Sequence, residues 1–196
     1  ADDGMTPLMV AVEQQNLEIV RRLINSGADV SKATQSHSTV MHYLGNTSNV
    51  LIADLIIPRI VDIDEKKDGN FTALTIALSE YHNEMAFRFI EAGASLEKAL
   101  EPAPHIIPEF VMNDNREMLE YFWEQGVIDP YVVFQQNNLF HYACWFNNVA
   151  FVQELLDRGL WEYSKNHDGE TPLDIARRME RQEIIDMVTA AGLTQP

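Results

Sequence analysis

The sequence predicts an all-α solenoid in which six similar units, each made of two antiparallel helices and an extended finger loop, stack on one another. Three observations support this fold class. A glycine that ends a helix-like stretch recurs at intervals of 33 residues, a helix-starting residue stands 21 residues before it, and apolar residues hold fixed places between the two. Such a period is typical of repeat proteins, because one small unit cannot bury its own apolar face.

The spacing holds across six copies without insertion or deletion, which argues against a chance origin. The glycine is Gly27, Gly93, Gly126, Gly159 and Gly192, with Ile60 in the second copy. Thirteen residues after the helix-starting residue, the side chain is apolar in every copy: Ile19, Ile52, Met85, Met118, Phe151 and Ile184.

The first copy shows the local logic of each element. Thr6 is a suitable N-cap and Pro7 suits the first helical position, so a helix is expected over roughly 7–14. A polar break follows, and the second helix is expected over roughly 17–25, where apolar residues fall at helical spacing. Gly27 can adopt the left-handed conformation that ends this helix. The following ADVSKATQSH lacks a helical pattern and forms the finger.

These stretches resemble the ankyrin repeat. The resemblance is carried by TPLMVAVEQQNLEIVRRLINSGADV in the first copy, FTALTIALSE and FIEAGASLE in the third, NNLFHYACWFNNVAFVQELLDRG in the fifth and GETPLDIARRMERQEIIDMVTAAG in the last. It covers essentially the whole chain. Two copies depart from the pattern, the second through Ile60 and Pro58 and the fourth through Pro108, so irregular geometry is expected there.

The whole chain is therefore expected to form a single array over 1–196. Its repeats are expected at about 1–33, 34–66, 67–99, 100–132, 133–165 and 166–196. The last copy carries polar residues such as Arg177 and Thr189 on its outer side and is interpreted as a C-terminal cap. The first copy shows no such polar residues, so further repeats or another element are expected to precede it, unless a short array tolerates an uncapped end.

The composition limits the partners. The chain has 14 basic and 30 acidic side chains and a net charge of −16, which disfavours nucleic acid and anionic lipid and favours a basic protein or peptide. There is no apolar stretch of membrane-spanning length. The single cysteine, Cys144, excludes an internal disulfide and suggests an intracellular, cytoplasmic location. We expect a monomeric array.

The sequence does not favour an enzyme. His141 and Cys144 lie three residues apart, a spacing that could pair a nucleophile with a base. The structural interpretation is stronger, because the resemblance gives His141 a structural hydrogen bond and buried cysteines are usually inert. We expect no catalytic residues, no cofactor and no metal site.

The resemblance implies a concave binding face, built from the fingers and the exposed side of each first helix. Large apolar side chains and acidic ones occupy these positions in copies three to five, which predicts a groove with an apolar floor and an acidic rim. The expected partner-binding residues are Asp68, Phe71, Glu80, Glu101, Met112, Phe134, Trp145 and Phe146. In the alternative, Trp145 and Phe146 fold back and fill space left by the irregular fourth copy.

The sequence thus favours a non-enzymatic scaffold or adaptor that binds a protein or peptide, apolar with basic flanks. One alternative is the substrate- or target-recruiting part of a larger enzyme or of a secreted pathogen effector. Another is a structural spacer between other domains.

Overall fold

The computed structural model describes residues 3–129, 134–160 and 164–192 and divides the chain into two compact units. Unit 1 comprises residues 1–104 and unit 2 comprises residues 105–196. Each unit is an all-α solenoid of paired helices, as the sequence predicts.

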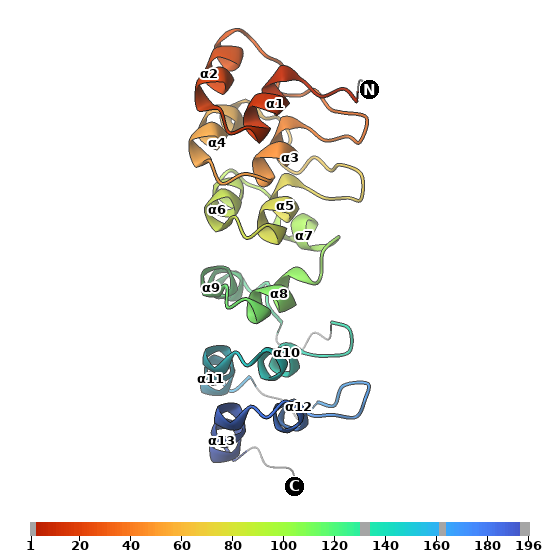
Figure 1. Ribbon diagram of the computed structural model, residues 1–196, viewed down its shortest axis with the longest axis vertical. Helices are drawn as coiled ribbons and strands as arrows, with labels where there is room; N and C mark the ends of the chain where they lie inside the picture. The colour runs from red at the N-terminus through yellow and green to blue at the C-terminus, as the bar shows by residue number, and fades with distance from the viewer. Residues whose placement is uncertain (1–2, 130–133, 161–163, 193–196) are drawn as a thin grey trace. The chain divides into compact units, whose positions relative to one another are not determined.

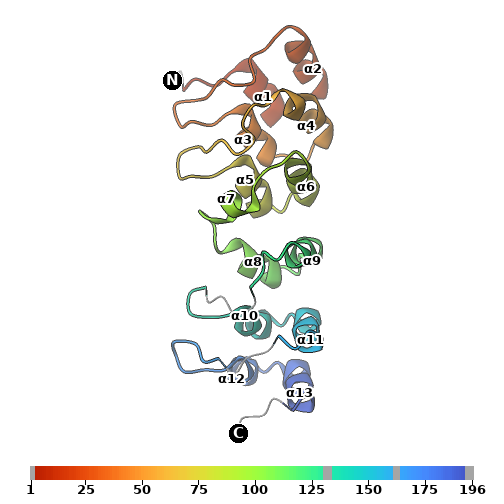
Figure 2. The same cartoon turned by 180° about the vertical axis from the view of Figure 1, so that it is seen from behind.

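Unit 1 stacks three helix pairs in two layers. Figure 1 shows α1, α3 and α5 in one layer and α2, α4 and α6 in the other, and Figure 2 shows the same layers from behind. The helices are α1 (Pro7–Glu13), α2 (Leu17–Asn25), α3 (Val40–Gly45), α4 (Val50–Ile56), the 3₁₀ helix η1 (Ile57–Arg59), α5 (Ala73–Ser79), α6 (Asn83–Glu91) and α7 (Leu96–Leu100).

Unit 2 repeats this arrangement. Its first layer contains α8, α10 and α12, and its second contains α9, α11 and α13 (Figure 1). The helices are α8 (Ile106–Met112), α9 (Arg116–Glu124), α10 (Leu139–Phe146), α11 (Val149–Asp157), α12 (Pro172–Arg178) and α13 (Gln182–Ala190).

The helices begin and end where the sequence signals place them. The Thr6 hydroxyl accepts a hydrogen bond from the Met9 amide at 3.2 Å, which caps α1. The Asn138 side chain caps α10 in the same way, through the His141 amide at 3.0 Å. After α2, Gly27 has a φ of +81°, and after α6, Gly93 has a φ of +97°, a conformation that glycine adopts without strain.

The irregular second and fourth copies differ from the others, and one further helix was not predicted. The second copy ends in η1, which contains Pro58, in place of a glycine cap. Between the third and fourth copies, α7 replaces the finger, with Ser95 as its N-cap. Among the described residues the fingers form isolated antiparallel bridges, Ala33–Thr39 and Phe134–Asn137, and no longer strand.

Stacking buries the apolar positions that recur in each copy. Ile52 and Met85 in unit 1 and Met118 and Ile184 in unit 2 are completely buried. Each buried side chain of this size contributes about 1.5–3 kcal/mol relative to an exposed one. The cores of the two units therefore lie between successive helix pairs.

Two buried histidines join successive copies by hydrogen bonds. The His42 ring on α3 lies 3.1 Å from the Phe71 carbonyl in the next copy, and its other nitrogen accepts from the Thr39 amide at 3.0 Å. In unit 2, the His141 ring lies 3.2 Å from the Glu170 carbonyl. A neutral ring with one donor and one acceptor satisfies such a site.

A second kind of link starts at the N-caps of α11 and α6. The Asn148 amide group donates to the Val111 carbonyl at 2.8 Å and to Asp114 at 3.1 Å, while its oxygen accepts from the Phe151 amide at 3.0 Å. In unit 1, His82 lies 3.1 Å from the Gly45 carbonyl in the equivalent place. Asn148 thus caps α11 and also ties it to the preceding copy.

The buried histidines predict a pH-dependent stability. Burial lowers the pKa of His42 and of His141. The unfolded chain therefore binds protons first as the pH falls below about 6.5, so stability is full above that pH and decreases below it. The loss is at most about 1.4 kcal/mol per pH unit for each histidine. Urea unfolding between pH 7.5 and 5.5 measures it.

The control for this prediction is the double variant His42→Gln/His141→Gln, in which neutral amides replace both rings. Its unfolding free energy is expected to vary less with pH over the same range. The two acidic groups near His141, Glu170 and Asp174, do not interfere, because interactions lower the pKa of both and move their titration further below this window. An unchanged slope in the double variant would show that other groups cause the dependence.

Replacing Asn148 is expected to destabilise unit 2. Asn148→Ala removes a helix cap and leaves the Val111 carbonyl without its partner, at a cost of about 1–3 kcal/mol. Asn16→Ala is the matched control, because the exposed Asn16 caps α2 through the Ile19 amide, and its loss costs about 1 kcal/mol. Chemical denaturation compares the two, and equal losses would mean that the link between copies contributes nothing.

Candidate partner-binding surface

A row of neighbouring aromatic side chains marks the candidate surface in unit 2. We call Phe134, Tyr142, Trp145 and Phe146 the aromatic row. Three of them lie on α10 at helical spacings of three and four residues, and Phe134 lies in the finger before it.

The rings of the row contact one another in sequence. The centroids of Phe134 and Tyr142 are 6.4 Å apart, and those of Tyr142 and Phe146 are 6.2 Å apart with the ring planes within 7°. Trp145 follows Phe146 at 6.5 Å. The Tyr142 hydroxyl donates to the Phe134 carbonyl at 3.0 Å, which holds the finger against the helix. The row is therefore ordered before any partner binds.

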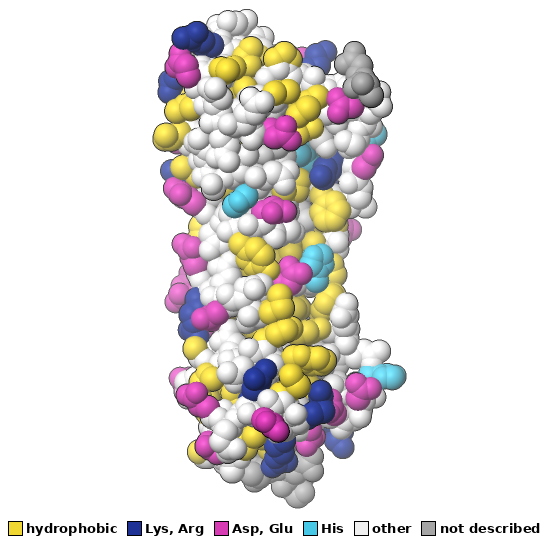
Figure 3. All heavy atoms as spheres, in the orientation of Figure 1, with side chains coloured by type: hydrophobic (Ala, Val, Ile, Leu, Met, Phe, Trp, Pro, Cys, Tyr) yellow, Lys and Arg dark blue, Asp and Glu magenta, His cyan; other side chains and the backbone are white. Residues whose placement is uncertain are grey.

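The outer part of the row remains exposed. Trp145 keeps 38% and Phe146 keeps 36% of its surface accessible, and Met112, at the position on α8 that corresponds to Trp145, keeps 41%. Figure 3 shows hydrophobic side chains gathered over α8 and α10, with basic side chains beyond them toward α12. Phe146 stacks on Tyr142 of its own helix, so neither Trp145 nor Phe146 is buried in the way that the alternative interpretation requires.

Charged side chains border the row. The Arg178 guanidinium lies over the Trp145 ring, 5.4 Å from its centroid, and donates to both carboxylate oxygens of Glu170 at 2.7 and 3.0 Å. These hydrogen bonds lower the pKa of Glu170. The row thus ends at an ion pair.

The other predicted site residues lie in unit 1. The Asp68 carboxylate lies 2.8 Å from the His37 ring, and Glu101 accepts from Lys66 at 2.9 Å. Glu80 is exposed just after α5. Phe71 is partly exposed, and its backbone carbonyl lies 3.1 Å from the His42 ring. The eight predicted residues are therefore divided between the units, with the acidic ones and Phe71 in unit 1 and the remaining apolar ones in unit 2.

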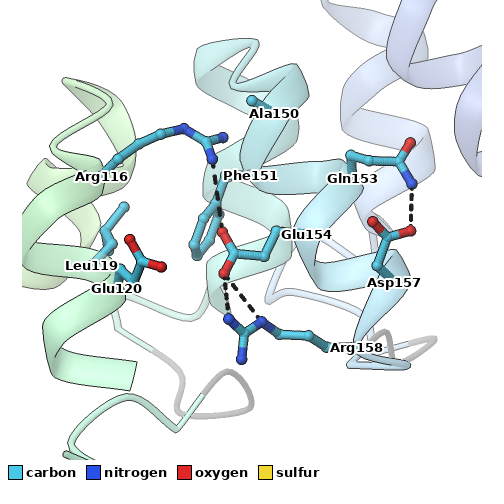
Figure 4. A pocket seen from close by; sticks show the side chains of 9 residues that line it. All are labelled: Arg116, Leu119, Glu120, Ala150, Phe151, Gln153, Glu154, Asp157 and Arg158. Carbon is cyan, nitrogen blue, oxygen red and sulfur yellow. Dashed lines mark hydrogen bonds and ion pairs between the residues drawn. The ribbon is translucent and has the colours of Figure 1, made fainter. Parts of the chain in front are cut away.

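A pocket of about 510 Å³ lies elsewhere in unit 2, between α9 and α11 (Figure 4). Glu154 occupies its centre, 2.8 Å from Arg158 and 3.9 Å from Arg116. Leu119 and Phe151 below are nearly inaccessible, so the pocket offers a partner little apolar surface. Its arginines are already paired, which makes it a weaker candidate than the aromatic row.

The His141–Cys144 pair has a structural environment. Burial raises the pKa of the Cys144 thiol far above neutrality, which disfavours the thiolate needed for nucleophilic attack. His141 is engaged with Asn138 and with the Glu170 carbonyl. In the part of the chain that the structure describes, no three histidine, cysteine or acidic side chains form a cluster that could hold a metal ion.

Two residues of this surface, Tyr142 and Arg178, were not among the expected partner-binding residues. Tyr142 could have been found from its spacing of four residues to Phe146, whereas the approach of Arg178 to Trp145 depends on stacking between copies. None of the described helices is long and apolar enough to cross a membrane.

Known proteins resemble the chain in sequence and in fold. A family model for three copies of the ankyrin repeat matches residues 8–99. The rice potassium channel AKT1 is 32% identical over 81 residues, 41% of this chain. A homologue of transient receptor potential cation channel A1 from Caenorhabditis elegans is 34% identical over 86 residues, 44% of this chain. The matched segments span only 9% and 7% of these two proteins.

Three solved structures show the same fold over nearly the whole chain. The human ASB11 ankyrin repeat domain matches with a TM-score of 0.74 and 24% identity, covering 96% of this chain and 84% of that one. An ankyrin repeat domain from Acinetobacter baumannii matches at 0.72 with 19% identity, covering 95% and 97%.

The third match is a chain from the complex of the predatory endopeptidase Bd0816 with immunity protein Bd3460, from Bdellovibrio bacteriovorus. Its TM-score is 0.76 with 18% identity, covering 95% and 98%. At these identities the likeness of the three structures concerns the fold. The family model thus identifies residues 8–99 as ankyrin repeats, and the three structures show that the chain has the ankyrin-repeat fold over nearly its whole length. Ankyrin-repeat domains are generally protein-binding modules.

Proposed function

We propose that this domain is a non-enzymatic adaptor module that binds an apolar, basic-flanked peptide segment of a partner protein on the aromatic row. The observation that carries the proposal is the row itself, four contacting rings of which Trp145 and Phe146 stay more than one third exposed. Exposed aromatic side chains on a rigid support are typical anchors of protein interfaces, because they bury a large area with few rotatable bonds.

The rigidity of the row supports the proposal. Tyr142, Trp145 and Phe146 lie on one helix, and the Tyr142 hydroxyl fixes Phe134 in the finger. A partner that docks on these rings does not have to order them first, which lowers the entropic cost of association. Met112, on the neighbouring helix α8, adds a flexible apolar side chain that adapts to the shape of the partner.

Charge supports the choice of a basic-flanked segment. Residues 105–196 carry fifteen acidic and six basic side chains. A field of this sign attracts a basic segment and disfavours an acidic one, and it acts mainly on the association rate. Asp68, Glu80 and Glu101 lie in unit 1 and add to the negative charge of the chain as a whole. The single cysteine fits action inside the cell, in a reducing compartment.

An alternative is that the array recruits substrates or targets for a larger enzyme or a secreted effector. One observation favours it: the curated relatives that match are far longer than the matched segment, so such repeats also occur within larger proteins. The mass of the native chain tests this alternative, because a product close to 22.3 kDa would leave no room for a catalytic domain.

The aromatic row is expected to control peptide binding. Peptides selected from a random display library on the wild-type domain should contain an apolar anchor next to lysine or arginine. The double variant Trp145→Ala/Phe146→Ala should bind them at least about tenfold more weakly, as the loss of a central anchor does. Isothermal titration calorimetry measures the affinity, and circular dichroism checks that the helices remain.

Leu51→Ala is the matched control, because Leu51 is 58% exposed on α4, in the other helix layer, and its variant should bind as the wild type does. Phe71→Ala separately tests the share of unit 1. Unchanged binding by the double variant would place the docking surface elsewhere, and selected peptides without basic residues would contradict the proposed charge preference.

A further inference from the structure

The aromatic row ends at a site that already holds a cation, the guanidinium group of Arg178. This group lies 5.4 Å from the Trp145 ring centroid, and its Nε and Nη2 atoms donate to the two carboxylate oxygens of Glu170. An aromatic face and a carboxylate that meet at one point form a favourable environment for a positively charged group.

The period of the fold brings the three residues together. Arg178 stands 33 residues after Trp145, so the two occupy equivalent positions at the ends of α10 and α12. Glu170 lies in the finger that leads into α12. The stacking of the last two helix pairs therefore places a carboxylate and an indole ring around the same space.

Glu170 and Trp145 are held by contacts that do not involve Arg178. The Glu170 amide donates to Asn166 at 3.0 Å, and its carbonyl faces the His141 ring at 3.2 Å. The Trp145 carbonyl accepts from Arg181 at 3.3 Å, and its ring lies against Phe146. The backbone of Glu170 and the Trp145 ring should therefore keep their places when Arg178 is absent, so the carboxylate stays tethered beside the ring.

Of the three residues, Arg178 should be the one whose replacement disturbs the fold least. Its side chain is 46% exposed at the last residue of α12, and its Nη1 atom lies 3.7 Å from the Met179 sulfur. An exposed ion pair of this kind contributes little to folding stability, so its removal should leave the fold intact.

We propose that Trp145 and Glu170 form a cation-binding subsite of the docking surface, and that Arg178 fills this subsite until a lysine or arginine side chain of the partner displaces it. This inference rests on the proposed function, because the subsite is the basic-residue pocket of the same row. Arg178 is thus an internal competitor for the partner's cationic side chain.

The competition has a defined consequence for affinity. A tethered side chain such as Arg178 acts at an effective concentration in the millimolar range. A cationic side chain of the partner must compete with it, so part of the partner's binding free energy in the subsite is lost. Removing Arg178 should raise the affinity for peptides that carry a cation at the right place. It should not change the affinity for peptides that lack one.

The first experiment tests the subsite without a partner. Guanidinium chloride is titrated from 0 to about 100 mM at constant ionic strength, and the tryptophan indole signals are followed by NMR. In Arg178→Ala, the Trp145 signal should shift and saturate with a millimolar dissociation constant, as expected for an exposed cation site. In the wild type it should not saturate, and in Arg178→Ala/Glu170→Gln the saturation should disappear.

The chain supplies two controls for this titration. The Trp123 ring lies 4.7 Å below Arg158, which is unchanged in all variants, so its indole signal should respond equally in each. Arg177→Ala removes a neighbouring exposed arginine of α12 and should behave as the wild type does. A linear response of Trp145 in Arg178→Ala, or a saturating one in the wild type, would overturn the inference.

The second experiment tests the displacement with a selected basic peptide and with the same peptide carrying norleucine in place of each lysine or arginine. Arg178→Ala should bind the basic peptide about three- to tenfold more tightly than the wild type does and the norleucine peptide unchanged. Weaker binding of the basic peptide would make Arg178 part of the partner contact and overturn the inference. If neither peptide binds any form, the proposed function fails, while the guanidinium titration still decides whether the subsite exists.

Discussion

The structure depends on burial between successive helix pairs, because a single pair has no partner for its own apolar side chains. The position thirteen residues after each helix-starting residue shows this constraint directly. Within unit 1, Ile52 and Met85 at this position are completely buried, whereas Ile19 in the first copy is 44% exposed. The three side chains have similar chemistry and equivalent places on their helices, so the preceding copy accounts for the difference. Stacking, together with the histidine and asparagine links between copies, therefore determines which side chains are buried.

The candidate binding surface consists of side chains that remain exposed after the helix pairs have stacked. At the repeat position of Met112 and Trp145, the side chains of the first three copies are polar: Glu13 ends α1, Asn46 is the C-cap of α3 and Ser79 ends α5. In contrast, α8 and α10 carry Met112, Trp145 and Phe146 at their ends. Nothing in the core requires aromatic residues there, since these side chains keep more than a third of their surface exposed. The position of Phe146 is not exposed in every copy. Thr47, which is equivalent to Phe146, is buried, and its hydroxyl donates to the Leu44 carbonyl. The exposure of a side chain therefore depends on its residue type as well as on its position in the repeat.

The sequence predicts the periodic parts of this molecule and misses the parts that break the period. The caps at Thr6 and Gly27 are local signals and mark α1 and α2 accurately, and the 33-residue spacing extends them along the chain. Helix α7 was missed because the finger was expected after Gly93, although Ser95 is a good N-cap for the stretch LEKAL. In the candidate surface, the repeat position led to the expectation that Trp145 and Phe146 are exposed, although Thr47 at the position equivalent to Phe146 is buried. The stacking of Tyr142 on Phe146 and the reach of Arg178 to Trp145 depend on rotamers and on contacts between copies, which no single helix encodes.

The aromatic row of the last two copies has two consequences that conflict in a repeat protein, one for partner binding and one for unspecific association. An exposed row of aromatic rings favours partner binding, and the same row favours unspecific association through its apolar area. A cation held over Trp145 by Glu170 covers the outer end of the row with a charged group while leaving the rings in place. The group that covers the row is Arg178 of the same chain. Only a partner with a cationic side chain at this place can displace Arg178 and still pair with Glu170. The specificity of the surface for basic segments would then arise from this exchange, in addition to the long-range attraction of a chain with a net charge of −16.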